Sequence, residues 1–211
     1  MPSRITFRVS TGVNQEWECP IRCTRCEYIK ANGLQCRNTV CYGSPLCWQH
    51  NRMEWGVRAR PSTIPGAGKG LFATRAFAQG DWICPMTCEQ ITQVCLDQRY
   101  PGDMTAPYAE IDPGGNGDIT DCACSRGIAS QANALFQPNG LVRPEEDHNA
   151  IALTGYDAQN VSMGIWLSAR TNILAGAEIF LWYGTDEGPD AYRLEDTHTT
   201  RRRSMKDTRP C

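Results

Sequence analysis

The chain has 211 residues, of which 41% are hydrophobic and 21% are charged. These proportions are ordinary for a soluble globular protein, and the length allows one well-packed core plus a small appended unit. No apolar run approaches the roughly 18 to 20 residues of a membrane-spanning helix. Met1–Trp17 also lacks the apolar stretch of a secretory signal. We therefore expect an intracellular protein without membrane contact.

The formal net charge of −2 conceals three segments of different sign. Residues 22–60 carry seven basic and two acidic residues, which gives +5. Residues 61–190 carry six basic and sixteen acidic residues, which gives −10, and residues 191–211 carry six and three, which gives +3. Such a field attracts a basic polymer to the middle segment and an acidic one to the ends. Solvated surface charge is the plain alternative for each run.

Residues 1–18 show a weak strand-like alternation at Ile5, Phe7 and Val9, which predicts an N-terminal arm or an edge strand. Six of the twelve cysteines follow between Cys19 and Cys47. In a reducing compartment this density indicates metal ligation or buried thiols. Residues 19–54 have no long apolar run, so we expect this unit to depend on a bound metal for its stability.

The strongest ligand set in this unit is Cys26, Cys36, Cys47 and His50. Three thiolates and one imidazole complete the closed tetrahedral shell of a structural zinc. The segment from Cys26 to His50 also resembles a small zinc-binding module common in large DNA viruses and phage. Replacing Cys36 by Cys23 gives a second set with C-x2-C and C-x2-H spacing, and both sets stay open at this point.

The next part of the chain shows short strand signals separated by turn formers, which predicts a mostly-β (α+β) domain of small sheets. Cys88–Tyr100 is the best helix candidate, and Asp112–Asp118 reads as a hairpin or loop tip. Residues 193–211 form a basic tail that we expect to be disordered. The predicted strands are Gly70–Ala73, Asp81–Cys84, Ile151–Leu153, Ile165–Leu167 and Glu178–Leu181.

The glycine run Gly66–Gly70 is not a phosphate-binding loop. A Walker loop requires Gly where Thr63 stands and Ser or Thr where Gly70 stands, and the dinucleotide fingerprint requires Gly where Leu71 stands. The run instead predicts a glycine-lined turn that enters a strand and lets a ligand lie against bare backbone.

Three separated segments, Ser62–Ala73, Asn133–Asn139 and Ala175–Gly184, together resemble the motifs of SET-domain protein lysine methyltransferases. The resemblance covers about Trp55–Tyr192. It implies a β-clip-like fold in which the C-terminal stretch makes a knot-like crossing.

The resemblance assigns S-adenosylmethionine as cofactor. Ala67, Gly68 and Lys69 would hold it through main-chain groups, and Asn133 would hydrogen-bond to it. Ala134 stands where the family usually has His, so the main-chain contact can survive while a side-chain role is lost.

Tyr183 is the predicted catalytic residue, with Tyr108 as a weaker candidate beside the lysine channel. Methyl transfer to an amine needs alignment, desolvation and oriented dipoles but no general base. The family's cysteine cluster after the SET domain is absent, since only Cys211 follows Tyr183. An aromatic residue such as Tyr192, or a second subunit in a homodimer, would then close the channel.

We therefore predict a SET domain at residues 55–192 that methylates a lysine of a basic protein, with a histone H3 tail as the expected substrate. The short insert between the motifs is similar to that of histone-directed and small viral SET enzymes. We expect a nuclear protein, or one in the host nucleus or virion if viral, with nucleic acid or a nucleosome surface as a partner of the zinc unit. Two rival functions remain: an inactive SET-like adaptor, and a zinc-dependent nucleic-acid-binding protein.

Overall fold

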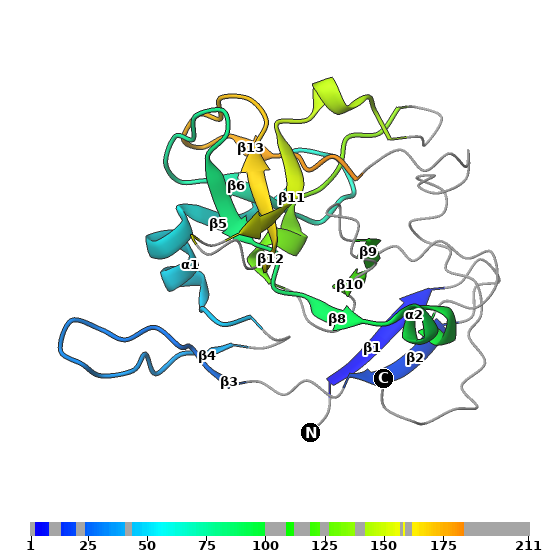
Figure 1. Cartoon of the computed structure of the whole chain (residues 1–211), viewed down its shortest axis with the longest axis horizontal. Helices are drawn as coiled ribbons and strands as arrows, with labels where there is room; N and C mark the ends of the chain where they lie inside the picture. Colours follow the sequence, from blue (N-terminus) through cyan, green and yellow to red (C-terminus); the bar gives the residue numbers. More distant parts are fainter. Residues whose placement is uncertain are drawn as a thin grey trace.

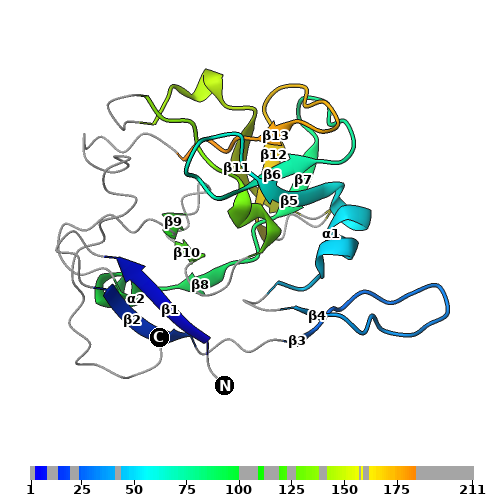
Figure 2. The same ribbon diagram turned by 180° about the vertical axis from the view of Figure 1, so that it is seen from behind.

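A computed structural model describes residues 3–8, 14–19, 24–40, 44–99, 109–111, 119–122, 127–137, 142–156, 158 and 162–183. These residues form small antiparallel sheets, two short α-helices and two 3-10 turns (Figures 1 and 2). The predicted mostly-β architecture is therefore confirmed. Neither helix among these residues has the length and apolar character needed to cross a membrane.

The first sheet of the main body has strand order β13-β6-β5. These strands span Val57–Pro61 (β5), Lys69–Ala73 (β6) and Glu178–Ile179 (β13). The central strand β6 is buried from Gly70 to Ala73, as the apolar run after the glycine turn predicts. Glu178 pairs with Phe72 and Ile179 with Leu71, so the third sequence segment lies directly against the first.

The second sheet has strand order β11-β12-β7, formed by Ala150–Tyr156 (β11), Ser162–Ala169 (β12) and Trp82–Pro85 (β7). Its inner face carries Leu167 opposite Cys84, both fully buried. This face and the first sheet enclose the main core, where each fully buried aliphatic side chain contributes roughly 1.5 to 3 kcal/mol. The largest core side chains are Val57, Leu71, Phe77, Ile83, Leu167, Ile173 and Ile179.

The C-terminal segment lies between two other segments of the body. Phe180 forms a parallel bridge with Asn133, and Leu181 forms one with Ala150. The N–H of Leu181 donates to the carbonyl of Asn133 at 2.9 Å, and the N–H of Trp182 donates to the carbonyl of Ala150 at 3.1 Å. The segment is thus held on both sides, as expected of a knot-like crossing.

A third sheet, with strand order β8-β10-β9, comprises Glu89–Ile91 (β8), Ile119–Asp121 (β10) and Ala109–Ile111 (β9). Strands β9 and β10 flank the predicted hairpin tip, which itself lies outside the described residues. The helix predicted over Cys88–Tyr100 is only partly correct, because α2 spans Gln93–Arg99 and a strand precedes it. Ile91 pairs with Ile119 there, and this cross-strand pairing overrides helix propensity.

Two cysteines of this sheet region are joined, which differs from the thiols we expected. Cys88 and Cys122 form a disulfide with their Cα atoms 4.7 Å apart, directly beyond the last paired residues of β8 and β10. Cys84 is a free thiol in the main core, and burial raises its pKa. Cysteine count alone did not separate these two environments.

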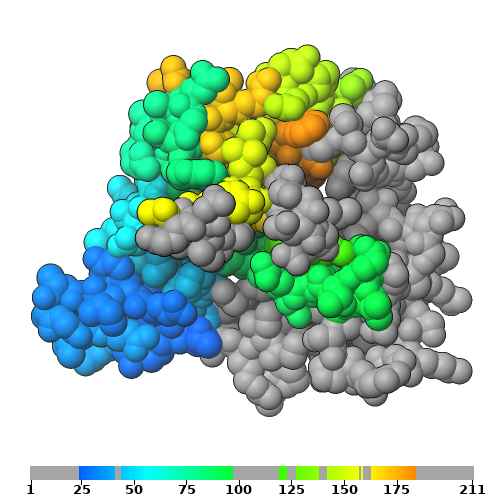
Figure 3. Space-filling view, viewed as in Figure 1, coloured from blue at the N-terminus to red at the C-terminus, as the bar shows by residue number. Residues whose placement is uncertain are grey.

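The N-terminal part contains two hairpin-like units and a helix. Strands β1 (Ser3–Arg8) and β2 (Asn14–Cys19) pair antiparallel, which confirms the strand expected near Ile5 and Phe7. The two-residue strands β3 (Thr24–Arg25) and β4 (Thr39–Val40) pair antiparallel within the cysteine-rich unit, residues 19–54. Helix α1 (Trp48–Trp55) follows and ends at the left-handed Gly56. Figure 3 shows the cysteine-rich unit as a lobe beside the main body.

Candidate functional site

The predicted glycine turn is the hairpin loop between β5 and β6. The N–H of Ser62 donates to the carbonyl of Gly68 at 2.9 Å, which closes the loop just beyond the pair Pro61 and Lys69. Gly66 and Gly68 have φ of 81° and 72°, a conformation that favours glycine. Residues 65–69 are exposed. The predicted glycine-lined turn that enters a strand is therefore present, and its residues are exposed.

Glu178 lies beneath this turn and is only 5% exposed. Its carboxylate accepts hydrogen bonds from Ser62 Oγ at 2.6 Å and from the N–H of Thr63 at 2.7 Å. Burial would raise the pKa of Glu178, but hydrogen bonds from Ser62, Thr63 and Asn133 outweigh it and hold the pKa below its ordinary value. The group is thus a buried carboxylate that stays ionised. Sequence reasoning placed Glu178 in a strand and in the third family motif but gave it no role at the turn.

Asn133, predicted to contact the cofactor, lies at the same turn. Its Nδ2 donates to the carbonyl of Lys69 at 2.9 Å and to Ser62 Oγ at 3.2 Å. The structure therefore brings the second motif onto the end of the glycine turn. The amide nitrogen holds the protein's own main chain, and the amide oxygen is the other polar atom of this side chain.

Leu135, which follows the departure from the family motif at Ala134, is held by a histidine from further along the chain. Ala134 is 1% exposed. The N–H of Leu135 donates to His148 Nε2 at 2.9 Å, and His148 Nδ1 donates to the carbonyl of Pro144 at 3.0 Å. The ring is therefore neutral and holds two main-chain segments together. A lone histidine after a polar turn gave no sequence signal for this role.

Burial of His148 predicts acid sensitivity. Burial is the main cause that lowers its pKa from 6.5, Arg143 and Arg170 add to the effect, and the Pro144 carbonyl and Asp147 oppose it. Below about pH 6.5, His148 is protonated in the unfolded chain but stays neutral in the folded chain over a further pH range. The free energy of unfolding should therefore fall by up to about 1.4 kcal/mol for each pH unit in that range. Above pH 7, His148 is neutral in both states, so protonation causes no loss of stability. Urea titrations of wild type and His148→Gln between pH 7.5 and 5 should show a shallower dependence in the variant; equal slopes would contradict the prediction.

Tyr183 lies at the edge of the main core, beyond the C-terminal crossing. Its hydroxyl donates to the carbonyl of Ala132 at 2.9 Å, next to Asn133. This bond fixes the direction of the hydroxyl, whose oxygen keeps lone pairs that can accept. Tyr108 and Tyr192 lie outside the described residues, as does the basic tail.

The four predicted zinc ligands come together in the cysteine-rich unit. Their ligand atoms all lie within 4.8 Å of one another, and all four residues are buried. Cys26 Sγ lies 3.2 Å and Cys47 Sγ 3.3 Å from His50 Nδ1. The preferred set with Cys36 is thus assembled, whereas Cys23 lies outside the described residues.

Outer contacts around the cluster suit thiolate ligands. The N–H of Cys47 donates to Cys26 Sγ at 3.2 Å, and Asn38 Nδ2 donates to Cys47 Sγ at 3.3 Å. Burial raises the pKa of Cys47, but hydrogen bonds from Asn38 and from main-chain N–H groups outweigh it and lower the pKa to about 6, whereas burial raises the pKa of Cys26. Tyr28 stacks on the His50 ring at 3.8 Å and orients it. The ligand atoms, their number and the hydrogen bonds that orient them therefore fit a zinc ion.

Together these observations define a mostly-β protein in which a glycine turn, an asparagine segment and a crossing C-terminal segment meet. The SET domain family model matches residues 68–184, more than half of the chain. The chain belongs to the SET domain family. Among curated protein sequences, none matches it significantly.

Several solved structures are similar to the chain at low identity. The Chaetomium thermophilum polycomb repressive complex 2 (PRC2) shares 23% identity over 65% of this chain, with a TM-score of 0.48. A ctPRC2 structure bound to S-adenosylmethionine shares 24% over 64%, with a TM-score of 0.47. The methyltransferase domain of human PR domain-containing protein 2 shares 16% over 67%, covers 87% of that chain, and has a TM-score of 0.43. The match spans only 16% of each of the two PRC2 chains, and membership rests on the family model.

Proposed function

We propose that the protein is a protein lysine N-methyltransferase that uses S-adenosylmethionine. One observation carries the proposal: Asn133 joins the glycine turn and the crossing C-terminal segment through direct hydrogen bonds, to Lys69 on one side and Leu181 on the other. Three segments distant in sequence thereby form one site in a chain of the SET domain family.

The cofactor would lie against the exposed turn. Main-chain groups of Ala67, Gly68 and Lys69 would hold it, with Ala134 contributing main chain and Asn133 its amide oxygen. S-adenosylmethionine supplies an activated methyl group on a sulfonium. Because the turn is closed by Ser62 and anchored by Asn133 through the protein's own hydrogen bonds, little ordering entropy would be lost on binding.

Tyr183 would act on the reacting centre. Its hydroxyl donates a hydrogen bond to the Ala132 carbonyl, so the lone pairs of the hydroxyl oxygen can accept weak C–H···O contacts and orient the lysine amine. Lysine must first lose a proton from a reference pKa of about 10.4, and partial burial beside a positive charge lowers that value. No histidine or carboxylate base is then required.

The acidic middle segment predicts the substrate. Residues 61–190 carry a formal charge of −10, so a basic sequence around the target lysine, such as a histone H3 tail, would be attracted electrostatically. The KM for an H3 tail peptide should rise severalfold as ionic strength goes from about 0.05 to 0.3 M, because the Debye length falls below about 10 Å. Steady-state assays with basic and acidic peptides test this. A KM independent of salt, or preference for an acidic peptide, would exclude the charge argument.

We also propose that Cys26, Cys36, Cys47 and His50 hold a structural zinc in a separate unit, residues 19–54, ahead of the SET domain at residues 55–192. All four positions are filled by protein ligands, so the metal would have no site for water and would serve stability. A histone substrate implies that the protein works at chromatin.

Two measurements test the proposed function. Isothermal titration with S-adenosylmethionine should show binding, and labelled cofactor should transfer its methyl group to histone H3. Binding without transfer to any protein of a nuclear extract would favour the inactive adaptor. A nucleic-acid gel shift that a chelator abolishes, with no cofactor binding, would favour the nucleic-acid-binding protein.

A further inference from the structure

The turn that would hold the cofactor also contacts a buried carboxylate, that of Glu178. We propose that Glu178 is a positioning residue that fixes the Ser62–Lys69 turn in its ligand-binding conformation. The proposal rests on the proposed function for the identity of the ligand. Its own content is that one buried carboxylate sets the shape of the turn.

Both carboxylate oxygens of Glu178 accept hydrogen bonds from the residues at the turn. Its Oε2 accepts from the N–H and the hydroxyl of Thr63, and its Oε1 accepts from Ser62 Oγ and, at 3.5 Å, from Asn133 Nδ2. Ser62 Oγ also accepts from the N–H of Ile64 at 3.0 Å. The carboxylate thus orders the first three residues of the turn and the side chain of Asn133. Hydrogen bonds to an ionised acceptor are stronger than neutral ones, so this arrangement is stiff.

Gly70 shows that space is kept for the carboxylate. A Cβ at Gly70 would lie 1.9 Å from Glu178 Oε1, and its φ is not in the left-handed region. Glycine is therefore needed here for room, whereas Gly66 and Gly68 are suited to their positive φ. Gly70 of the first motif therefore leaves the space that the carboxylate of Glu178, in the third motif, occupies.

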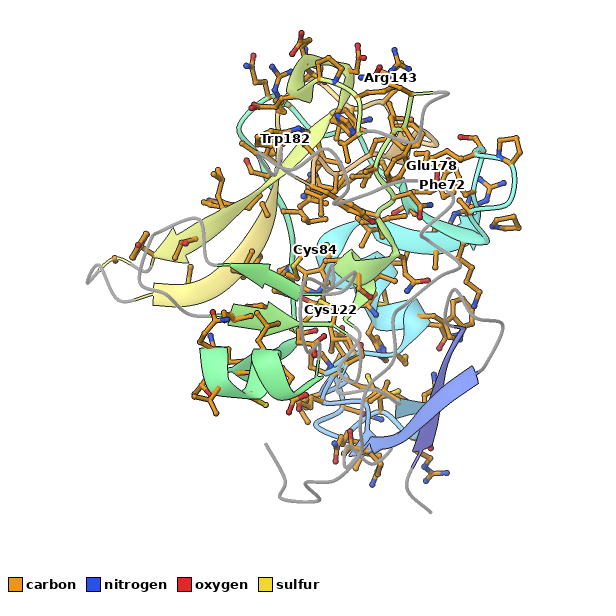
Figure 4. All side chains as sticks on the ribbon, turned by 90° about the vertical axis from the view of Figure 1, so that its right-hand side faces the viewer. Phe72, Cys84, Cys122, Arg143, Glu178 and Trp182 are labelled. Atoms are coloured by element: carbon orange, nitrogen blue, oxygen red, sulfur yellow. A yellow bond between two sulfur atoms is a disulfide. The ribbon has the colours of Figure 1, made fainter. Side chains whose placement is uncertain are left out.

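The main chain of Glu178 is also fixed. Asn149 Nδ2 donates to the carbonyl of Glu178 at 2.9 Å, and the N–H of Phe180 donates to Asn149 Oδ1 at 2.8 Å. Figure 4 shows Glu178 beside Phe72, its partner in the pairing of β13 with β6. The carboxylate is therefore presented from a rigid strand, so its position can define that of the turn.

The central test compares Glu178→Gln with the control Glu145→Gln, whose carboxylate pairs with Arg170 outside the turn. Glu178→Gln should raise the Kd and KM for S-adenosylmethionine about tenfold or more, which is the loss of about one buried charged hydrogen bond, while kcat at saturating cofactor changes less than threefold. Glu145→Gln should change neither. A purely structural role would lower the melting temperature without this separation of KM from kcat. A Kd for Glu178→Gln within twofold of wild type would overturn the proposal.

Hydrogen exchange without cofactor gives a readout that is independent of activity. Amides of residues 62–70 should exchange faster in Glu178→Gln, while strand β12 stays as protected as in wild type. Gly70→Ala, which keeps the charge but displaces the carboxylate, should act in the same direction, and Glu178→Asp should restore part of the protection. If Glu178→Gln does not fold, these two variants decide the question, and unchanged exchange and cofactor Kd in Gly70→Ala would overturn the proposal.

The failures of the two proposals can be told apart. Wild type that binds no S-adenosylmethionine contradicts the proposed function, and the exchange experiment then still decides whether Glu178 anchors the turn. Wild type that binds the cofactor as tightly as a folded Glu178→Gln variant contradicts only the role of Glu178.

Discussion

Replacing Tyr183 by Phe should lower kcat by about a hundredfold or more while leaving the Kd for S-adenosylmethionine within about threefold of wild type. The hydroxyl would act mainly in the transition state, so its loss appears in turnover rather than in ground-state binding. The donated hydrogen bond to Ala132 would fix where the oxygen points, and the ring would keep its place at the edge of the core. Methyl transfer to an H3 peptide and isothermal titration measure the two quantities.

A matched control is Tyr156→Phe, because Tyr156 is 46% exposed in β11. This variant should keep wild-type turnover. Normal turnover of Tyr183→Phe would instead identify Tyr183 as a packing residue and remove the catalytic assignment.

Removing zinc should unfold the cysteine-rich unit. Among the described residues of the unit, the buried apolar cluster consists of Cys26, Cys36, Val40 and Cys47, and three of these are proposed metal ligands, so this cluster would be small without the metal. A structural zinc supplies on the order of 10 kcal/mol of folding free energy. Elemental analysis should find one tightly held zinc per chain. A strong chelator should abolish exchange protection in residues 24–55 and leave the β5–β6 sheet protected.

Single cysteine variants identify the ligands. Cys36→Ser should lose zinc, whereas Cys84→Ala, which removes a core thiol outside the cluster, should keep it. Full zinc in Cys36→Ser together with loss in a Cys23→Ser variant would move the fourth ligand to Cys23. Purified protein without zinc would remove the site.

The parts that could be predicted from sequence depend on local patterns. The glycine turn and strand β6 follow from consecutive residues, and the cluster of Cys26, Cys36, Cys47 and His50 follows from their spacing within 25 residues. The role of Glu178 depends on Ser62, which lies 116 residues away. His148 likewise acts on Leu135, and neither residue belongs to a periodic pattern. These contacts form only when segments far apart in the chain pack against each other, so they could not be predicted from one sequence.

Residues 88–122 show that local sequence also predicts secondary structure incompletely. Cys88–Tyr100 has helical composition, but Ile91 and the residues before it are drawn into a strand by β10, about 30 residues later. The disulfide between Cys88 and Cys122 follows from the same pairing. Propensity gave the type of α2 correctly and its start incorrectly.

The position of Phe180–Trp182 between Asn133 and Ala150 has a consequence for how the protein is made. Because the closing contacts join segments far apart in the chain, their formation is expected to be a slow, late event in folding. The proposed binding site would be incomplete until that event, so a ligand specific for the site would bind only chains that have completed it. By mass action such a ligand stabilises the finished chain by RT ln(1 + [L]/Kd). Cellular cofactor concentration would then influence the yield of mature protein as well as its turnover.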